Sequence, residues 1–248
     1  MRWVVCVALA ALVSSCASME TARFQARSGQ EAMVRDGQPA IVSRKANSLV
    51  IVRPASRQFQ AGRRPVYVVG MYNLTKAPLQ YATSNTTVEQ QIAGQGTQAL
   101  RVYTYEELVA EERNRQVAQA LIVGLAAGAN AMSTANAGRY SGNATVYGAR
   151  GPYNVSYSGY DPTAAAIAQS RVAAQNDAMI ANTIETGQRN LAGLEQSVMK
   201  DNTLLPGEWY GGQLHFDPPS GDSGKSYTIN IQLGRDLHQI EVAHVSAS

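Results

Sequence analysis

Residues 227–233 read Tyr-Thr-Ile-Asn-Ile-Gln-Leu, so apolar and polar side chains alternate over the whole stretch. Successive side chains of a β-strand point to opposite faces of a sheet, and this period is typical of a strand with one face in a core and the other in water. We therefore expect a sheet that is solvated on one side. Its neighbouring strands are expected over residues 214–217 and 238–245.

The same texture occurs much earlier in the chain. β-Branched and aromatic residues bounded by glycine and proline are the sequence signal of strands. Five more strands are expected on this basis, over residues 49–53, 66–72, 79–83, 86–90 and 100–104. The segment 66–81, with Asn73 and Pro78 at its turn, is similar to the strand pairs of immunoglobulin-like modules. This similarity implies an immunoglobulin-like β-sandwich.

Between the two groups of strands the hydrophobic period becomes helical. Thr104 precedes Glu107 at the spacing of a capping box, in which each side chain bonds the other residue's free backbone amide. This predicts a helix from residue 105 to about residue 132. A second helix is predicted to begin at Asp161, a capping acid followed by Pro162, and to end at about residue 200.

Each predicted helix carries a stripe that favours close packing. Small residues recur at every fourth position of the first helix, at Ala120, Gly124 and Gly128, and such spacing lets helices approach closely. The second helix has an apolar stripe with coiled-coil spacing, which comprises Ile180, Ile184, Gly187, Leu191, Leu194 and Val198. We expect an antiparallel helical hairpin packed through these residues. The alternative is an oligomer seam or a membrane-inserting segment, although Gln119 and Asn130 interrupt the apolar run.

The predicted hairpin ends in a tip, residues 133–160, that is built largely of Gly, Ser, Ala and Asn. Tyrosine and arginine within it are residue types that anchor protein interfaces. The candidate partner-binding side chains are Tyr140, Tyr147, Arg150, Tyr153, Tyr157 and Tyr160. Residues 145–147 and 154–157 are able to pair as a small β-hairpin, and a low-complexity linker is the other interpretation.

These elements predict an α+β fold. A β-sandwich of residues 48–104 and 205–248 is split in sequence by a helical hairpin inserted at residues 105–204. Residues 16–47 show no sustained period and are expected to be a tether, with a short helix around residues 30–35.

The first residues predict export and a lipid anchor. After Arg2, residues 3–13 form an uncharged run of signal-peptide length. The run ends in Leu12-Val13-Ser14-Ser15-Cys16, which resembles the lipobox of bacterial lipoproteins. The resemblance implies that residues 1–15 are removed, that the Cys16 thiol carries diacylglycerol, and that Ala17 directs sorting to the outer membrane. The alternative is a secretory signal cut after Ala17, which discards Cys16.

The remaining side chains limit the chemistry of the mature chain. Cys6 lies in the signal segment and Cys16 takes the lipid, so thiol catalysis and an internal disulfide are excluded. The motifs of serine hydrolases, phosphate loops and zinc proteases are missing. We expect no metal site, because His238 and His244 are about 20 Å apart along one strand and His215 lies on another.

The sequence therefore predicts a lipid-anchored, non-enzymatic component of a bacterial cell-envelope complex. It is expected in the outer membrane facing the periplasm, with other envelope proteins or its own copies as partners and no cofactor besides the lipid. Nucleic acid is not expected as a partner, because the net charge is only +3 and no basic cluster is interleaved with aromatic residues. The alternative is a periplasmic solute-binding module or a hydrolase, with Asp217, Asp222 and His215 as its polar residues.

Overall fold

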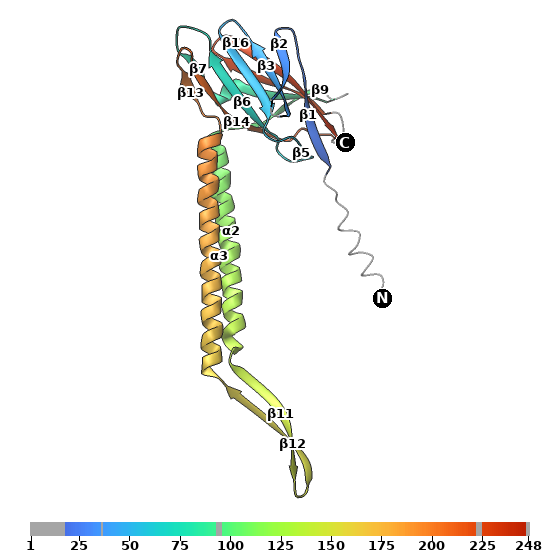
Figure 1. The fold of residues 1–248 in the computed structure, drawn as a ribbon, viewed down its shortest axis with the longest axis vertical. Helices are drawn as coiled ribbons and strands as arrows, with labels where there is room; N and C mark the ends of the chain where they lie inside the picture. Colours follow the sequence, from blue (N-terminus) through green and yellow to red (C-terminus); the bar gives the residue numbers. More distant parts are fainter. Residues whose placement is uncertain (1–17, 36, 93–95, 222–224, 247–248) are drawn as a thin grey trace. The chain divides into compact units, whose positions relative to one another are not determined.

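The computed structural model describes residues 18–35, 37–92, 96–221 and 225–246. The chain divides into two compact units (Figure 1). The first, here called the sandwich unit, comprises residues 1–108 and 195–248, and the second, the hairpin unit, comprises residues 109–194. Cys16 and the signal segment lie outside the described residues.

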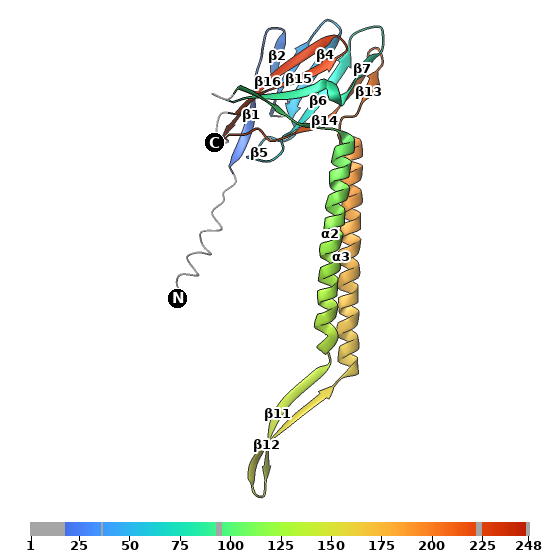
Figure 2. The ribbon, with the colours of Figure 1, turned by 180° about the vertical axis from the view of Figure 1, so that it is seen from behind.

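The sandwich unit contains two antiparallel sheets of six strands each within the described residues. The first sheet has the order β5 (Phe59–Gln60), β1 (Met19–Gln25), β16 (Asp236–Ser246), β15 (Lys225–Leu233), β8 (Thr86–Ile92) and β9 (Gly96–Leu100). The second has the order β10 (Val102–Tyr103), β14 (Trp209–Phe216), β6 (Val66–Asn73), β4 (Ser48–Pro54), β3 (Gln38–Arg44) and β2 (Gln30–Arg35). Figures 1 and 2 show these sheets from opposite sides.

The two sheets share one apolar core. The period-two pattern of β15 buries Tyr227, Ile229, Ile231 and Leu233, as predicted from the sequence. Side chains of β4 and β6 in the other sheet belong to the same cluster. Each large apolar side chain removed from water contributes about 1.5–3 kcal/mol. The prediction of an α+β chain, with a sandwich of antiparallel sheets interrupted by two long helices, is confirmed at this level.

One predicted strand pair is wrong. The segment after β6 was expected to fold back as a hairpin, but β7 (Leu79–Tyr81) pairs with β13 (Asn202–Leu204), whereas β6 pairs with β4 and β14. The side chain of Asn73 explains the change of direction, because its Nδ2 donates to Ala77 O at 2.8 Å and to Leu204 O at 3.0 Å.

The tether expected over residues 16–47 is also wrong for its described part. Strands β1, β2 and β3 occupy this region, and β2 stands where a short helix was expected. β2 lies at a sheet edge with Val34 76% exposed, so its side chains show no apolar period. β1 shows no regular apolar period either, because its inward face includes a buried carboxylate, Glu20.

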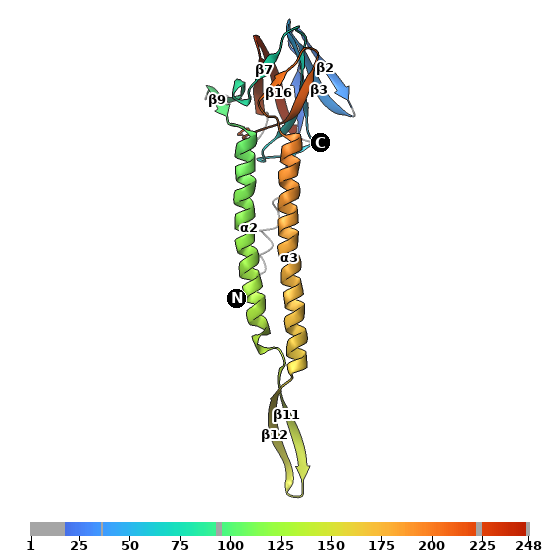
Figure 3. The same ribbon diagram turned by 90° about the vertical axis from the view of Figure 1, so that its left-hand side faces the viewer.

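The hairpin unit is formed mainly by two long helices, α2 (Tyr105–Ser133) and α3 (Pro162–Ser197), which lie side by side (Figure 3). Between them are a short 3-10 turn, Thr134–Asn136, and the strands β11 (Arg139–Gly148) and β12 (Gly151–Tyr160). Both predicted helix starts are confirmed. Glu107 Oε2 accepts from Thr104 N at 2.9 Å and Glu107 N donates to Thr104 Oγ1 at 3.3 Å, while Asp161 Oδ1 accepts from Thr163 N at 2.8 Å.

Candidate functional site

The two helices contact each other through small and polar side chains. Buried or half-buried positions of α3 recur in steps of three, four and four residues at Ala165, Ala168, Val172, Asn176, Met179, Thr183, Gly187, Asn190 and Leu194. Leu191 and Ser197, near the helix end, are half-buried as well. Asn130 Nδ2 donates to Asn176 Oδ1 at 3.2 Å, and Gln116 Nε2 donates to Gly187 O at 3.0 Å. This set of contacts is called the polar seam below.

A carboxylate is buried at one end of the polar seam. Glu112 is 7% exposed and accepts hydrogen bonds from Asn190 Nδ2 at 3.0 Å and Gln116 Nε2 at 3.2 Å. It also forms an ion pair with Arg115. Burial raises the pKa of Glu112, but the hydrogen bonds and the charge of Arg115 outweigh burial and hold that pKa below its usual value. The seam is therefore held by satisfied polar groups.

Only some of the residues predicted to pack the helices together lie at the polar seam. Gly187 is buried there and its carbonyl oxygen accepts from Gln116 Nε2. Ile180 and Ile184 are 45% and 56% exposed. Their heptad spacing drifts away from the eleven-residue repeat of the actual contact. Leu191 and Leu194 are half-buried, whereas Val198 follows the helix end and forms a bridge with Gln213 in the sandwich unit. The prediction is therefore correct for Gly187 and for the leucines near the end of α3, and wrong for Ile180 and Ile184.

The small residues of α2 are also not at the polar seam. Ala120, Gly124 and Gly128 are exposed, and a Cβ added at either glycine meets no atom within 4 Å. Packing of these residues against α3, the interpretation preferred from the sequence, is wrong. The helices meet on the other side of α2, where amide side chains rather than glycines make the contacts.

The outer side of α2 carries large apolar side chains. Five of them are between 62% and 78% exposed, namely Val117, Leu121, Ile122, Leu125 and Met132. Spacings of about four residues put most of them on one helix face together with Gly124 and Gly128. This set is called the apolar stripe. Contiguous exposed apolar surface marks contacts with proteins or membranes.

The apolar stripe belongs to a segment without charge. No residue between Arg115 and Arg139 is charged. By length and composition alone, the helical segment Tyr105–Asn136 is apolar enough to cross a membrane, and none of its most apolar window is buried.

The tip of the hairpin unit forms a two-stranded sheet in which β11 and β12 pair over their full lengths. The small hairpin expected over residues 145–147 and 154–157 is confirmed and is longer than predicted. The candidate tyrosines are exposed, but the register divides them between the two faces. Tyr140, Tyr153 and Tyr157 lie on one face, Tyr147 and Tyr160 on the other, and Arg150 lies in the turn. They do not form one patch.

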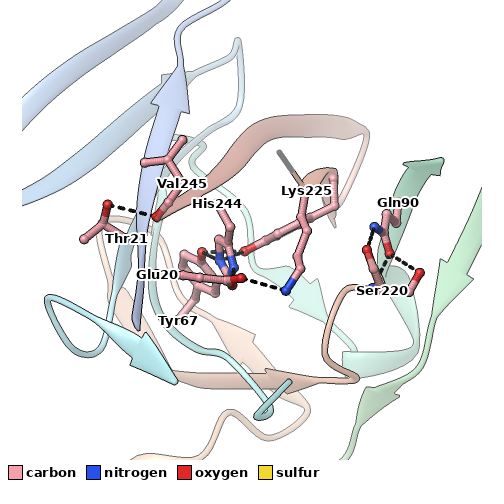
Figure 4. Close-up of polar contacts among 9 residues, drawn as sticks. Glu20, Thr21, Tyr67, Gln90, Ser220, Lys225, His244 and Val245 are labelled. Carbon is pink, nitrogen blue, oxygen red and sulfur yellow. Dashed lines mark hydrogen bonds and ion pairs between the residues drawn. The ribbon is translucent and has the colours of Figure 1, made fainter. Parts of the chain in front are cut away.

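A buried polar network in the sandwich unit escaped the sequence analysis (Figure 4). Glu20 of β1 accepts from Lys225 Nζ at 2.7 Å and contacts His244 Nδ1 at 3.1 Å. His244 Nε2 lies 2.7 Å from Tyr227 Oη and 3.1 Å from Tyr67 Oη, and the two tyrosine hydroxyls are 2.5 Å apart. Each of these residues is at most 8% exposed.

Burial and pairing decide the protonation of this network. Burial lowers the pKa of His244 despite the opposing effect of Glu20, and burial raises the pKa of Tyr67 and Tyr227. The hydrogen bonds from Lys225 and His244 outweigh burial and lower the pKa of Glu20. A neutral imidazole that donates from Nδ1 to Glu20 and accepts a tyrosine O–H at Nε2 satisfies every member. Because these groups are buried and hydrogen-bonded to one another, the network fastens β1 to the core.

A second buried cluster combines serine, histidine and aspartate. Ser48 Oγ lies 2.7 Å from Asp236 Oδ2 and 2.9 Å from His238 Nε2, and His238 Nδ1 lies 3.0 Å from Ser43 Oγ. In a hydrolase triad the histidine stands between the acid and the serine. Here the serine stands between the other two, and Ser43, Ser48 and His238 are fully buried. Burial lowers the pKa of His238 to about 4, so the ring is neutral at pH 7.

Asp217 and His215, two of the polar residues named for the enzyme alternative, each have a hydrogen-bonding neighbour in the described part of the chain. Asp217 accepts from Tyr103 Oη at 2.6 Å, and His215 Nε2 lies 3.3 Å from Gln213 Oε1. Asp222 lies outside the described residues. Within residues 18–35, 37–92, 96–221 and 225–246, no three His, Cys, Asp or Glu side chains are grouped so as to hold a metal ion.

Comparison with known proteins adds no relative. No family model matches the chain, and neither a curated protein nor a solved structure matches it.

Proposed function

We propose that the chain is a lipid-anchored structural component of the bacterial cell envelope that assembles with copies of itself through its helical hairpin. The observation that carries this proposal is the inverted pattern of the hairpin unit. Its helices meet through the polar seam, while Leu121, Leu125 and Met132 face outward at 66%, 77% and 78% exposure. A surface helix of a globular protein normally turns its apolar face toward its own core.

Burial of the apolar stripe against a partner is energetically favourable. Removing a leucine or isoleucine side chain from water contributes about 1.5–3 kcal/mol, and the stripe holds several such side chains along one helix. Gly124 and Gly128 leave open space beside them, which allows another helix to approach closely. The polar side chains between the two helices already bond one another within the polar seam, so a partner at the stripe has none of them to pair.

A second copy of the chain fits this surface better than a charged partner. The stripe lies in a segment with no charged residue, so two identical stripes meet without repulsion or stranded charges. Ile180 and Ile184 of α3 add exposed apolar area to the same hairpin unit. Rings and pairs of identical subunits are the commonest assemblies of soluble proteins.

The location within the cell follows from the lipobox resemblance of residues 12–16. Attachment of diacylglycerol to Cys16 and sorting to the outer membrane, facing the periplasm, belong to this proposal. An immunoglobulin-like class for the sandwich is proposed as well. The two-layer antiparallel core supports that class, whereas the pairing of β7 with β13 speaks against it.

A solute-binding module or a hydrolase is the alternative function. The buried clusters around His238 and His244 offer the right residue types, but no substrate has access to them. We therefore prefer the assembly function.

The test measures the mass of the full-length protein extracted from native membranes in mild detergent, by native mass spectrometry. The native chain is expected to form an oligomer, alone or with defined partners. The double variant Leu121→Glu, Leu125→Glu should run as a monomer, because burying two carboxylates in the contact is unfavourable. Ala178→Glu adds a charge at an exposed position of α3 outside the stripe and should leave the oligomer intact. A monomeric native protein, or equal assembly of all three forms, would refute the proposal.

A further inference from the structure

The β11–β12 hairpin is amphipathic across its two faces. Cross-strand partners in the register share a face. One face carries Tyr140, Gly142, Ala144, Val146, Tyr153, Val155, Tyr157 and Gly159, and the other carries Ser141, Asn143, Thr145, Asn154, Ser156 and Ser158 over its central part. The hydrogen bond of Thr145 Oγ1 with Asn154 Oδ1 at 2.8 Å confirms that these two side chains lie together on the polar face.

The apolar face is smooth but uncovered. Tyr157 lies across Gly142 and Tyr140 lies across Gly159, so that a Cβ added at either glycine would come within 2.5 Å of the tyrosine hydroxyl. Tyrosines packed over cross-strand glycines pin the register of a hairpin. Yet Val146 and Val155 are 39% and 38% exposed, and the tyrosines of this face are more than half exposed. The hairpin unit does not cover this face with its own side chains.

Strand length and charge placement match a bilayer. Each strand has 10 residues, and strands of about 9–11 residues cross the hydrocarbon layer when tilted. Charges occur only at the two ends of the hairpin, with Arg139 at its base and Arg150 in its turn. Alternation of apolar and small polar residues without charges is the pattern of membrane-crossing strands.

Both outer edges of the hairpin are open. β11 pairs with β12 in a sheet of two strands, so each strand leaves one row of backbone groups without a strand partner. An isolated hairpin of this size is only marginally stable in water. In lipid, backbone N–H and C=O groups must be paired, and a closed ring of strands is the arrangement that pairs them all. Copies of the same hairpin supply matching edges.

We infer that the β11–β12 hairpins of several copies close into a β-barrel that crosses a membrane, with the tyrosine and valine face toward lipid and the serine, asparagine and threonine face toward a polar lumen. This inference rests on the self-assembly proposed above. The smallest membrane barrels have about eight strands, so at least about four copies are needed. A lumen lined by hydroxyl and amide groups passes small polar solutes with little preference for charge.

The test compares two neighbouring positions of opposite face in the full-length protein, purified in mild detergent and reconstituted into phosphatidylethanolamine and phosphatidylglycerol vesicles that contain a small dye. The native protein should release dye. Val155→Asp places a carboxylate toward lipid and should reduce release by about tenfold or more. Ser156→Asp places the same charge in the lumen and should keep release while shifting planar-bilayer currents toward cation selectivity.

Each alternative has a distinct result. Oligomers without dye release would overturn the barrel while leaving the assembly proposal intact, and monomers would remove both. If the two variants released dye equally, with unchanged ion selectivity, the hairpin would not line the pore. If only Leu121→Glu, Leu125→Glu lost release while its oligomer remained, the pore would belong to α2 and the barrel would be refuted. Both hairpin positions are exposed, so the circular dichroism spectrum of each variant is expected to match that of the native protein.

Discussion

The two units distribute apolar and polar side chains in opposite ways. The sandwich unit encloses a continuous apolar core and seals even its charged groups inside hydrogen-bonded networks. In the hairpin unit, Ala165 is the single buried apolar side chain among the described residues, Met179, Leu191 and Leu194 are half-buried, and the apolar stripe is exposed. A region that removes little apolar surface from water gains little from folding alone. The difference supports the proposal that the hairpin unit is one part of a larger assembly, whereas the sandwich unit has an apolar core of its own.

The largest expected effect concerns a charge sealed inside the sandwich. Lys225→Met leaves Glu20 buried without its cation, and breaking such a pair costs about 3–5 kcal/mol of unfolding free energy. The matched control is Arg27→Met, whose ion pair with Glu241 at 3.1 Å is 45% and 28% exposed and contributes less than about 1 kcal/mol. Urea unfolding followed by Trp209 fluorescence measures both. Equal losses of unfolding free energy in the two variants would mean that the buried ion pair contributes no more than the exposed one.

A smaller effect is expected from pH. The folded-state pKa of His238 is about 4, against 6.5 for the free group, because burial disfavours the charged ring, with Asp236 opposing burial and Lys45 reinforcing it. As pH falls, His238 is therefore protonated in the unfolded chain before it is protonated in the folded chain. The unfolding free energy is unaffected by this group above pH 6.5 and falls by about 3 kcal/mol as pH drops to 4.

His238→Gln keeps a donor for Ser48 and removes the titration. The unfolding free energy of this variant should fall less steeply between pH 6.5 and 4 than that of the native chain. It should still fall in acid, because the folded state lowers the pKa of Glu20 and of Asp236 and is destabilised when they are protonated. An unchanged slope would assign the acid sensitivity to groups other than this histidine.

The smallest effect has opposite signs at two glycines of α3. A Cβ at Gly187 would lie 2.6 Å from Gln116 Cδ, so Gly187→Ala displaces Gln116 from the polar seam and should cost about 1 kcal/mol after the gain in helix propensity. A Cβ at Gly193 would meet no atom within 4 Å, and Gly193→Ala should stabilise the helix by about 1 kcal/mol. Thermal melting by far-ultraviolet circular dichroism distinguishes them. Stabilisation by both would show that the seam contributes nothing.

Sequence patterns predicted most of the fold where local rules apply. The alternation in β15 and the capping residues Thr104 and Asp161 depend on neighbours a few positions away, and all three predictions are confirmed. β1 was missed because the burial of Glu20 depends on Lys225, which is distant in sequence. The polar seam was missed because amide side chains such as Asn130 and Asn176 are ordinarily surface residues.

The candidate interaction surfaces were predicted in part. The tyrosines of the tip were named, but their division between two faces follows from the register of β11 and β12, which composition does not specify. Gly124 and Gly128 were identified as a packing motif, and their spacing alone did not say which helix they face. The structure turns them away from α3.

If Cys16 carries the proposed lipid, the place of β1 in the sandwich limits how far this unit can lie from the membrane. β1 begins at Met19, so only residues 17 and 18 separate it from Cys16. A chain extends at most about 3.5 Å per residue, which limits the distance between Cys16 and the start of β1 to roughly 10 Å. If Cys16 carries the proposed lipid, any pull on the anchor passes directly into the strand held by Glu20, Lys225 and His244. In that case the network resists the mechanical force that the lipid anchor transmits to β1.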